Sequence, residues 1–134
     1  MTDSTHAYRV LVVDDNVDSA QSMSLLLQLE GHTVACAHDG LEALQVARDF
    51  GPEVVLLDLG LPRMNGYDVA RQLREHETGE APRMLLIAIS GYGRDQDRQA
   101  AHDAGFDFHL TKPADPDVVM RMMQDNGPRP KSGA

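Results

Sequence analysis

Short apolar runs alternate with amphipathic stretches five times along this chain. That alternation is typical of βα units, which build a parallel sheet with helices on both faces. The runs VVLLD and LLIAI are continuously apolar, as expected of strands buried on both faces, whereas TVACA is mixed and is expected nearer an edge. The predicted strands span residues 9–14, 33–37, 53–58, 84–90 and 107–111.

The amphipathic stretches predict five helices, whose ends are marked by caps, glycine and proline. These helices span about residues 17–30, 41–49, 67–77, 95–104 and 117–124. The apolar positions expected to pack are Ala20, Met23, Leu26, Leu27 and Leu29 in the first helix, and Val118, Val119, Met122 and Met123 in the fifth. The fourth helix is nearly all polar residues and alanine, so we expect it to be the least firmly packed and the part that moves.

Charged residues stand at the ends of three predicted strands. Asp14 and Asp15 follow VLVV, Asp58 follows VVLL, and Lys112 comes shortly after FDFHL. Open parallel sheets bind ligands beyond the carboxyl ends of their strands, so neighbouring strands would bring these four side chains together. Three carboxylates beside one lysine predict a site for a cation and a phosphate. Hard oxygen ligands, with no Cys or His nearby in the motif, favour Mg²⁺.

Composition narrows the class of protein. A chain of 134 residues has room for one domain of ordinary size. The net charge of −9 and the absence of a basic run argue against direct nucleic-acid binding, which requires Lys and Arg to neutralise phosphates. The apolar runs are too short to cross a membrane, no secretory signal is visible, and Cys36 is the only cysteine. We therefore expect a soluble, cytoplasmic protein without membrane insertion.

Four segments resemble, in order and spacing, the receiver domain of two-component response regulators, most of all receivers of hybrid histidine kinases. They are VLVVDDN (10–16), VVLLDLGLPRMNGYDVA (54–70), LLIAISGYG (85–93) and LTKP (110–113). The resemblance covers about residues 8–124, with 1–7 as an N-terminal extension and 125–134 as a tail expected to be disordered. It implies a flavodoxin-like, doubly wound α/β fold with strand order 2-1-3-4-5 and five helices.

The resemblance also assigns roles to matching residues. Asp58 would be the phosphoacceptor. The carboxylates of Asp15 and Asp58 and the backbone carbonyl of Gly60 would ligate Mg²⁺, with Asp14 acting through water. Clustered carboxylates repel one another, so at least one of their pKa values should rise unless a cation compensates. Asp14 and Asp15 could instead simply cap the first helix, but capping would not account for Asp58 and Lys112.

Ser90 and Lys112 would contact the phosphoryl oxygens, and a cis peptide bond is expected before Pro113. Receivers usually carry a Tyr or Phe three residues before this lysine, and its rotation with the Ser or Thr relays phosphorylation. Here that position is His109, which departs from the pattern. An imidazole is smaller, more polar and can be charged near neutral pH. We hypothesise that His109 modulates output, with a histidine that is merely packed or exposed as the plainer alternative.

The resulting hypothesis is a signalling module. A histidine kinase or histidine phosphotransfer protein would phosphorylate Asp58, and the added charge would switch the face made by the fourth helix, fifth strand and fifth helix. A downstream protein would bind that face, and a homodimer is a further option. We expect no enzyme activity beyond self-phosphorylation and autodephosphorylation. With no effector domain after the fifth helix, output would be by protein contact, unless the chain is the receiver of a larger kinase.

Two other classes stay open. A degenerate receiver would act as a binding or dimerisation module without phosphorylation, and failure to bind Mg²⁺ would favour it. An aspartate-nucleophile phosphatase would turn over small phosphomonoesters, although such enzymes carry the nucleophile on their first strand. The other histidines show no ligand spacing and are expected to be solvated; they are His6, His32, His38, His76 and His102.

Overall fold

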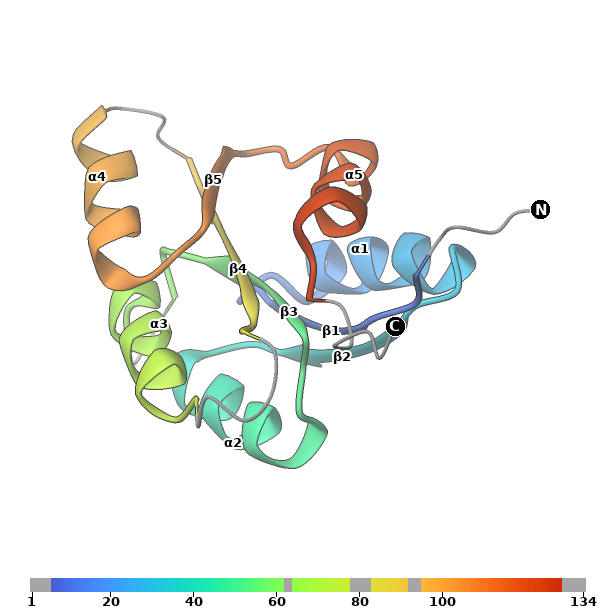
Figure 1. The fold of residues 1–134 in the computed structure, drawn as a ribbon, viewed down its shortest axis with the longest axis horizontal. Coiled ribbons are helices and arrows are strands. Elements are labelled where there is room, and N and C mark those ends of the chain that lie inside the picture. Colours follow the sequence, from blue (N-terminus) through green and yellow to red (C-terminus); the bar gives the residue numbers. More distant parts are fainter. Residues whose placement is uncertain (1–5, 62–63, 78–82, 92–94, 129–134) are drawn as a thin grey trace, which may run out of the picture.

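The computed structural model describes residues 6–61, 64–77, 83–91 and 95–128, in which five strands alternate with five helices (Figure 1). The strands are β1 (Arg9–Val13), β2 (Thr33–Ala37), β3 (Val54–Asp58), β4 (Leu85–Ser90) and β5 (Phe108–Thr111). The helices are α1 (Val17–Leu29), α2 (Gly40–Phe50), α3 (Gly66–Glu75), α4 (Asp95–Ala104) and α5 (Pro116–Asn126). All ten predicted elements are present, and the largest differences, two residues, are at the ends of α3 and α5.

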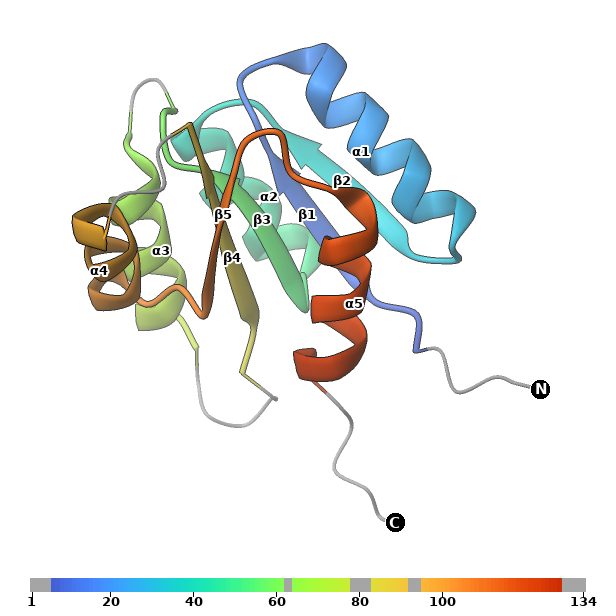
Figure 2. The same cartoon turned by 90° about the horizontal axis from the view of Figure 1, so that it is seen from above.

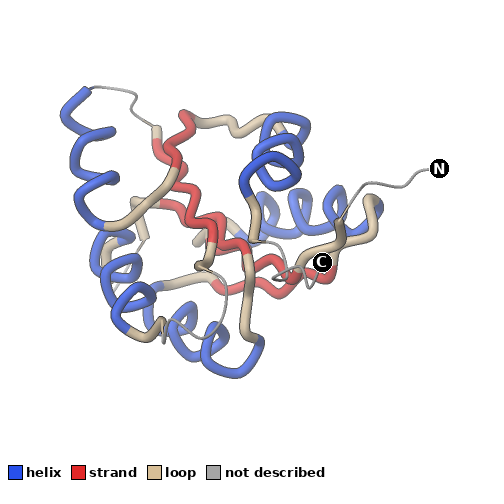
Figure 3. Tube along the Cα trace, viewed as in Figure 1, coloured by secondary structure: helices blue, strands red, loops and turns tan. Residues whose placement is uncertain are grey.

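The five strands form one parallel sheet in the order β2-β1-β3-β4-β5, which confirms the predicted topology. Figure 3 shows the strands as a central layer between helices. Every residue of β3 is buried, as the continuous apolar run predicted, whereas β2 lies at one edge and is partly exposed. Strands buried on both faces need no polar alternation, which is why VVLLD contains a single charge at its end.

Helices cover both faces of the sheet (Figures 1 and 2). One apolar cluster joins the sheet to α2, α3 and α4, and a second joins it to α1 and α5. Successive side chains of a strand point to opposite faces, so β1 contributes Leu11 and Val13 to the first cluster and Val10 and Val12 to the second. No helix in the described ranges is long and apolar enough to span a bilayer.

The apolar face predicted for α1 is partly wrong. Leu26 and Leu29 are 41% and 72% exposed, and Leu25 is exposed as well. The buried row consists of Ala20, Ser24 and Leu27. These three positions lie one above another on the helix, so a single row of side chains meets the sheet and the leucines beside it extend into solvent. A hydrogen bond between Ser24 Oγ and Cys36 Sγ, 2.8 Å long, satisfies the polar member of that row.

Two smaller expectations also fail. Val118 of α5 is 37% exposed, because Val119 and Met123 occupy the positions that face the sheet. His32 is buried rather than solvated, since its Nδ1 accepts the backbone N–H of Tyr8 at 3.0 Å. Burial lowers the pKa of His32, so the neutral ring that this bond requires is favoured. His6 and His38 are partly buried, whereas His76 and His102 are exposed as predicted.

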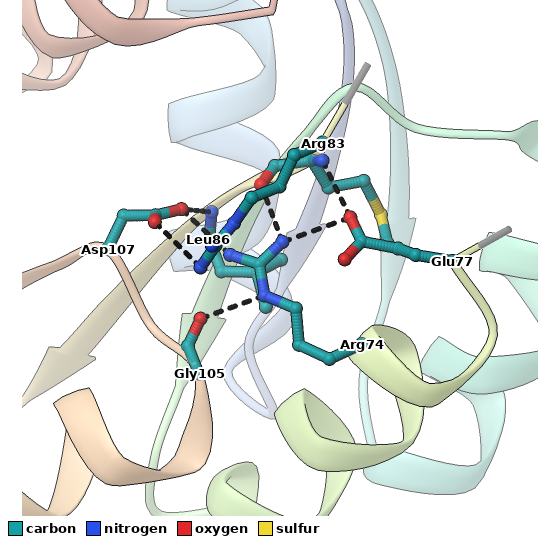
Figure 4. Close-up of polar contacts among 7 residues, drawn as sticks. Arg74, Glu77, Arg83, Leu86, Gly105 and Asp107 are labelled. Carbon is teal, nitrogen blue, oxygen red and sulfur yellow. Dashed lines mark hydrogen bonds and ion pairs between the residues drawn. The ribbon is translucent and has the colours of Figure 1, made fainter. Parts of the chain in front are cut away.

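Arg74 ties the C-terminal turn of α3 to the edge of the sheet where the strands begin (Figure 4). Its guanidinium is 15% exposed and donates to two carbonyl oxygens and two carboxylates. The acceptors are Gly105 O at 2.9 Å, Met84 O at 2.8 Å, Glu77 at 3.0 Å and Asp107 at 2.8 Å. Asp107 also accepts the backbone N–H of Leu86, so this one network links α3 with β4 and the start of β5.

We predict that Arg74→Met lowers the free energy of unfolding by about 2–4 kcal/mol, because it leaves partly buried acceptors without their donor. The matched control is Arg71→Met on the same helix. Arg71 is 53% exposed and, within the described part of the chain, pairs with Asp68 alone, so its loss should cost at most about 0.5 kcal/mol. Urea denaturation measures both, and equal losses would contradict the structural role of the network.

Candidate functional site

Three aspartates and a lysine meet at the edge of the sheet where the strands end. Asp14 and Asp15 directly follow β1, Asp58 is the last residue of the neighbouring β3, and Lys112 follows β5. One carboxylate oxygen from each aspartate lies within 4.8 Å of the others. The convergence expected from the strand ends is therefore present in the structure.

Asp58 is the most enclosed member of the group, with 4% of its surface exposed. Its Oδ2 accepts a hydrogen bond from Lys112 Nζ at 2.7 Å, and its Oδ1 accepts the backbone N–H of Gly60 at 2.9 Å. The bond to Asp58 raises the pKa of Lys112, which keeps the ammonium charged. The peptide bond between Lys112 and Pro113 is cis, as expected from the sequence.

Asp14 carries an energetic penalty in its ionised form. Burial is the main cause that raises the pKa of its carboxyl, and the charges of Asp58 and Asp15 raise it further. The N–H of Asn16, bonded to Asp14 Oδ1 at 2.9 Å, and the charge of Lys112 act in the opposite direction. A raised pKa in this cluster was expected, but its leading cause is burial rather than repulsion. A cation at this site would relieve both costs.

One neighbour of the site was not predicted. The Nδ1 of His38 lies 3.0 Å from the backbone carbonyl oxygen of Asp14. This contact connects the residue after β2 to the residue after β1. His38 follows β2 directly, and β2 is paired with β1. The signal was therefore available in the sequence, because His38 stands at the end of a predicted strand as the aspartates do.

A cleft of about 820 Å³ leads away from the carboxylates between α1 and α5. The three aspartates and Lys112 line one end of it. Its other lining residues include Leu56 and Ile89 from the sheet, Ser22, Met23 and Leu26 from α1, and Pro116 from α5. The charged end is therefore continuous with a more apolar passage. The exposed Leu26 stands on that passage, so a molecule that reaches Asp58 along it would contact α1.

Ser90 ends β4 at the same edge, and its backbone carbonyl accepts the N–H of Lys112 at 2.7 Å. Its side chain is paired with His109 of β5, with Ser90 Oγ 2.8 Å from His109 Nε2. The structure thus brings together both residues of the expected switch, and it does so by a direct side-chain hydrogen bond. The N-terminal extension before residue 6 and the predicted tail from residue 129 onward lie outside the described residues.

Comparison with known proteins identifies relatives of this arrangement. The sequence profile of the response regulator receiver domain matches residues 10–124. Response regulator MprA of Mycobacterium ulcerans is 40% identical over 105 residues, which are 78% of this chain and 44% of that protein. This chain therefore spans less than half the length of that relative.

Solved structures show the same fold. The chemotaxis response regulator CheY4 of Vibrio cholerae superposes with a TM-score of 0.81 at 26% identity, over 90% of this chain and 98% of that one. The receiver domain of Ssk1 from Saccharomyces cerevisiae, crystallised with the histidine phosphotransfer signaling protein Ypd1, gives a TM-score of 0.84 at 23% identity. That match covers 90% of this chain and 89% of the other.

We predict that Asp14→Asn raises the free energy of unfolding at pH 7 when a chelator removes divalent cations. The pKa of Asp14 is raised in the folded state, so its charged form opposes folding above that pKa, and this cost diminishes as the pH falls from there toward the lower pKa of the unfolded chain. The advantage of the variant should therefore shrink as the pH is lowered. Urea denaturation across a pH series measures this change.

The control is Asp18→Asn, which removes an exposed charge in the first turn of α1. A negative charge there is favourable to the helix, so this variant should be slightly less stable than the wild type. A loss of stability in Asp14→Asn at pH 7 in chelator would contradict the penalty assigned to the charged form of Asp14.

Proposed function

This chain belongs to the family of response regulator receiver domains, and on that basis we propose that Asp58 accepts a phosphoryl group as a regulatory signal. One observation carries the proposal. A carboxylate with 4% exposure lies 2.7 Å from a lysine ammonium and within 4.8 Å of two further carboxylates. A structural ion pair alone would not account for Asp14, whose pKa is raised by burial and by the neighbouring carboxylates, so that its charged form opposes folding unless a cation joins it.

The donor set fits Mg²⁺. The carboxylates of Asp15 and Asp58 and the backbone carbonyl of Gly60 would hold the ion, with Asp14 acting through water. These are hard oxygen ligands, and Mg²⁺ keeps several waters when it binds through one or two carboxylates. When bound, the ion neutralises charge on the phosphoryl oxygens. His38 touches the backbone of Asp14 and leaves the carboxylate oxygens to the ion.

The transfer step needs positioning and charge compensation more than covalent chemistry. An Asp58 oxygen attacks the phosphorus, a new P–O bond forms, and the P–N bond to the donor imidazole breaks with its electron pair remaining on nitrogen. Lys112 stays near Asp58 and bonds a phosphoryl oxygen, because its ammonium has three donor hydrogens. Ser90 supplies a second donor from the adjacent strand.

The donor is a histidine kinase or a histidine phosphotransfer protein. The solved structure with Ypd1 shows that a receiver domain of this fold associates with a phosphotransfer protein. In this chain Leu25, Leu26 and Leu29 are exposed on α1, and Leu26 lines the cleft that reaches Asp58. Exposed apolar side chains on the helix that borders this cleft suit a protein donor better than a small one.

Output is proposed to pass through the face formed by α4, β5 and α5. The new charge at Asp58 would shift a two-state equilibrium there and change the affinity of that face for a downstream protein or a second copy. α4 buries Ala101 and Ala104 and no large side chain among its described residues, which supports it as the moving part. We assign residues 8–124 to the receiver and propose a cytoplasmic setting for it.

We predict that acetyl phosphate with Mg²⁺ adds one phosphoryl group to the wild-type protein and none to Asp58→Asn, as measured by intact mass. Asp58→Asn retains the shape of the side chain but lacks the nucleophilic charge. Asp107→Asn is a matched control, because Asp107 is a partly buried carboxylate in an ion pair at the opposite edge of the sheet. That control should be phosphorylated like the wild type wherever it is folded.

A phosphoryl adduct that survives Asp58→Asn would overturn the site. A wild-type protein that neither binds Mg²⁺ nor forms the adduct would instead favour a binding module without phosphorylation. Continuous release of phosphate from small phosphomonoesters would favour a phosphatase.

A further inference from the structure

Ser90 and His109 lie on the α4 side of the sheet. Ala88 packs in the cluster with α2, α3 and α4, and Ser90 stands two residues later on the same strand. Phe108 and Leu110 pack in the cluster with α1 and α5, so His109 between them points the opposite way. The two side chains therefore meet on one face, at 2.8 Å between Oγ and Nε2, across the β4–β5 pair.

The surroundings of His109 decide which partner donates. Its Nδ1 is buried and has no hydrogen-bond partner among the residues that the structure describes. If the Ser90 hydroxyl donated to Nε2, Nδ1 of the neutral ring would carry a hydrogen, which is an orphaned buried N–H. If Nε2–H donates, Nδ1 is only a bare acceptor. Orphaned buried donors are the rarer and costlier of the two, so the geometry favours Nε2–H as the donor.

The charge state of the ring is consistent with this arrangement. Burial is the main cause that lowers the pKa of His109, and the Arg98 guanidinium on α4 lowers it further, against the opposing charge of Asp97. A protonated ring would carry a second N–H at the unpartnered Nδ1. The neutral ring with its hydrogen on Nε2 is therefore the form that fits this pocket.

We propose that His109 is a positioning residue for the phosphoryl group. Its Nε2–H donates to Ser90 Oγ, which directs the hydroxyl hydrogen of Ser90 toward a phosphoryl oxygen on Asp58. A hydroxyl that accepts one hydrogen bond donates a stronger one, so the pair works as a short relay from β5 to the site. This inference rests on the proposed function and gives the usual aromatic position a polar role that a Phe side chain does not have.

The test compares two substitutions at one position by titration with beryllofluoride, a phosphoryl mimic, in the presence of Mg²⁺. His109→Gln retains an N–H donor near the place of Nε2, and His109→Phe retains a ring without one. We expect His109→Phe to bind beryllofluoride about three- to tenfold more weakly, the effect of one neutral hydrogen bond, and His109→Gln to stay within about twofold of wild type. In a Ser90→Ala background, His109→Phe should have no additional effect.

Equal affinities of the Phe and Gln variants, or an undiminished effect of His109→Phe without Ser90, would overturn the positioning role. Those results leave the proposed function intact as long as the wild type binds beryllofluoride and Asp58→Asn does not. A wild type that fails to bind it would count against the proposed function and this inference together.

A measurement on the wild-type protein tests the donor assignment, and a variant is needed only to assign the signal. In ¹⁵N spectra of the imidazoles, the His109 signal, assigned by its loss in His109→Gln, should show a protonated Nε2 and a bare Nδ1. Adding beryllofluoride and Mg²⁺ should leave this tautomer unchanged. A hydrogen on Nδ1 in the neutral ring would overturn the proposal.

Discussion

The buried charge of Asp58 depends on the ammonium of Lys112, and only the order of the strands brings the two together. They are 54 residues apart in sequence: Asp58 ends β3, Lys112 follows β5, and β4 lies between those two strands. An ionised carboxylate that is 4% exposed would be costly without such a partner. Strand order and ion pair are therefore linked, because the buried carboxylate has its cation only in this topology.

The two edges of the sheet use charge differently. At the edge where the strands begin, Arg74 is 15% exposed and donates four hydrogen bonds to described residues of the chain, so its network holds α3, β4 and β5 in place. At the edge where they end, Lys112 is 44% exposed and pairs with Asp58, which clusters with two further carboxylates. A network whose donors and acceptors are all paired stabilises a fold, whereas carboxylates that outnumber their cationic partners favour a bound cation. This contrast supports the proposed site at the ends of the strands.

Periodicity and strand-end charges predicted the elements, their ends and the convergence of four side chains, because these depend on local spacing and on parallel topology. Local spacing could not predict which side chains from distant segments contact one another. The five apolar residues assigned to α1 span about half of the helix circumference, so spacing could not tell Leu27, which is buried, from Leu29, which is exposed. Buried His32 accepts the backbone N–H of Tyr8, which is 24 residues away in sequence, and His109 is hydrogen-bonded to Ser90 on another strand.

The buried row of α1 is small, consisting of an alanine, a serine and one leucine, while its larger leucines stand outside the core. One row of α1 therefore stabilises the fold, and a different row of the same helix forms its solvent-facing surface. Substitutions at Leu25 or Leu29 remove little buried area, so evolution is free to alter them without first compensating a loss in the core. Duplicated copies of such a chain could therefore come to bind different partner proteins while their interiors stay identical.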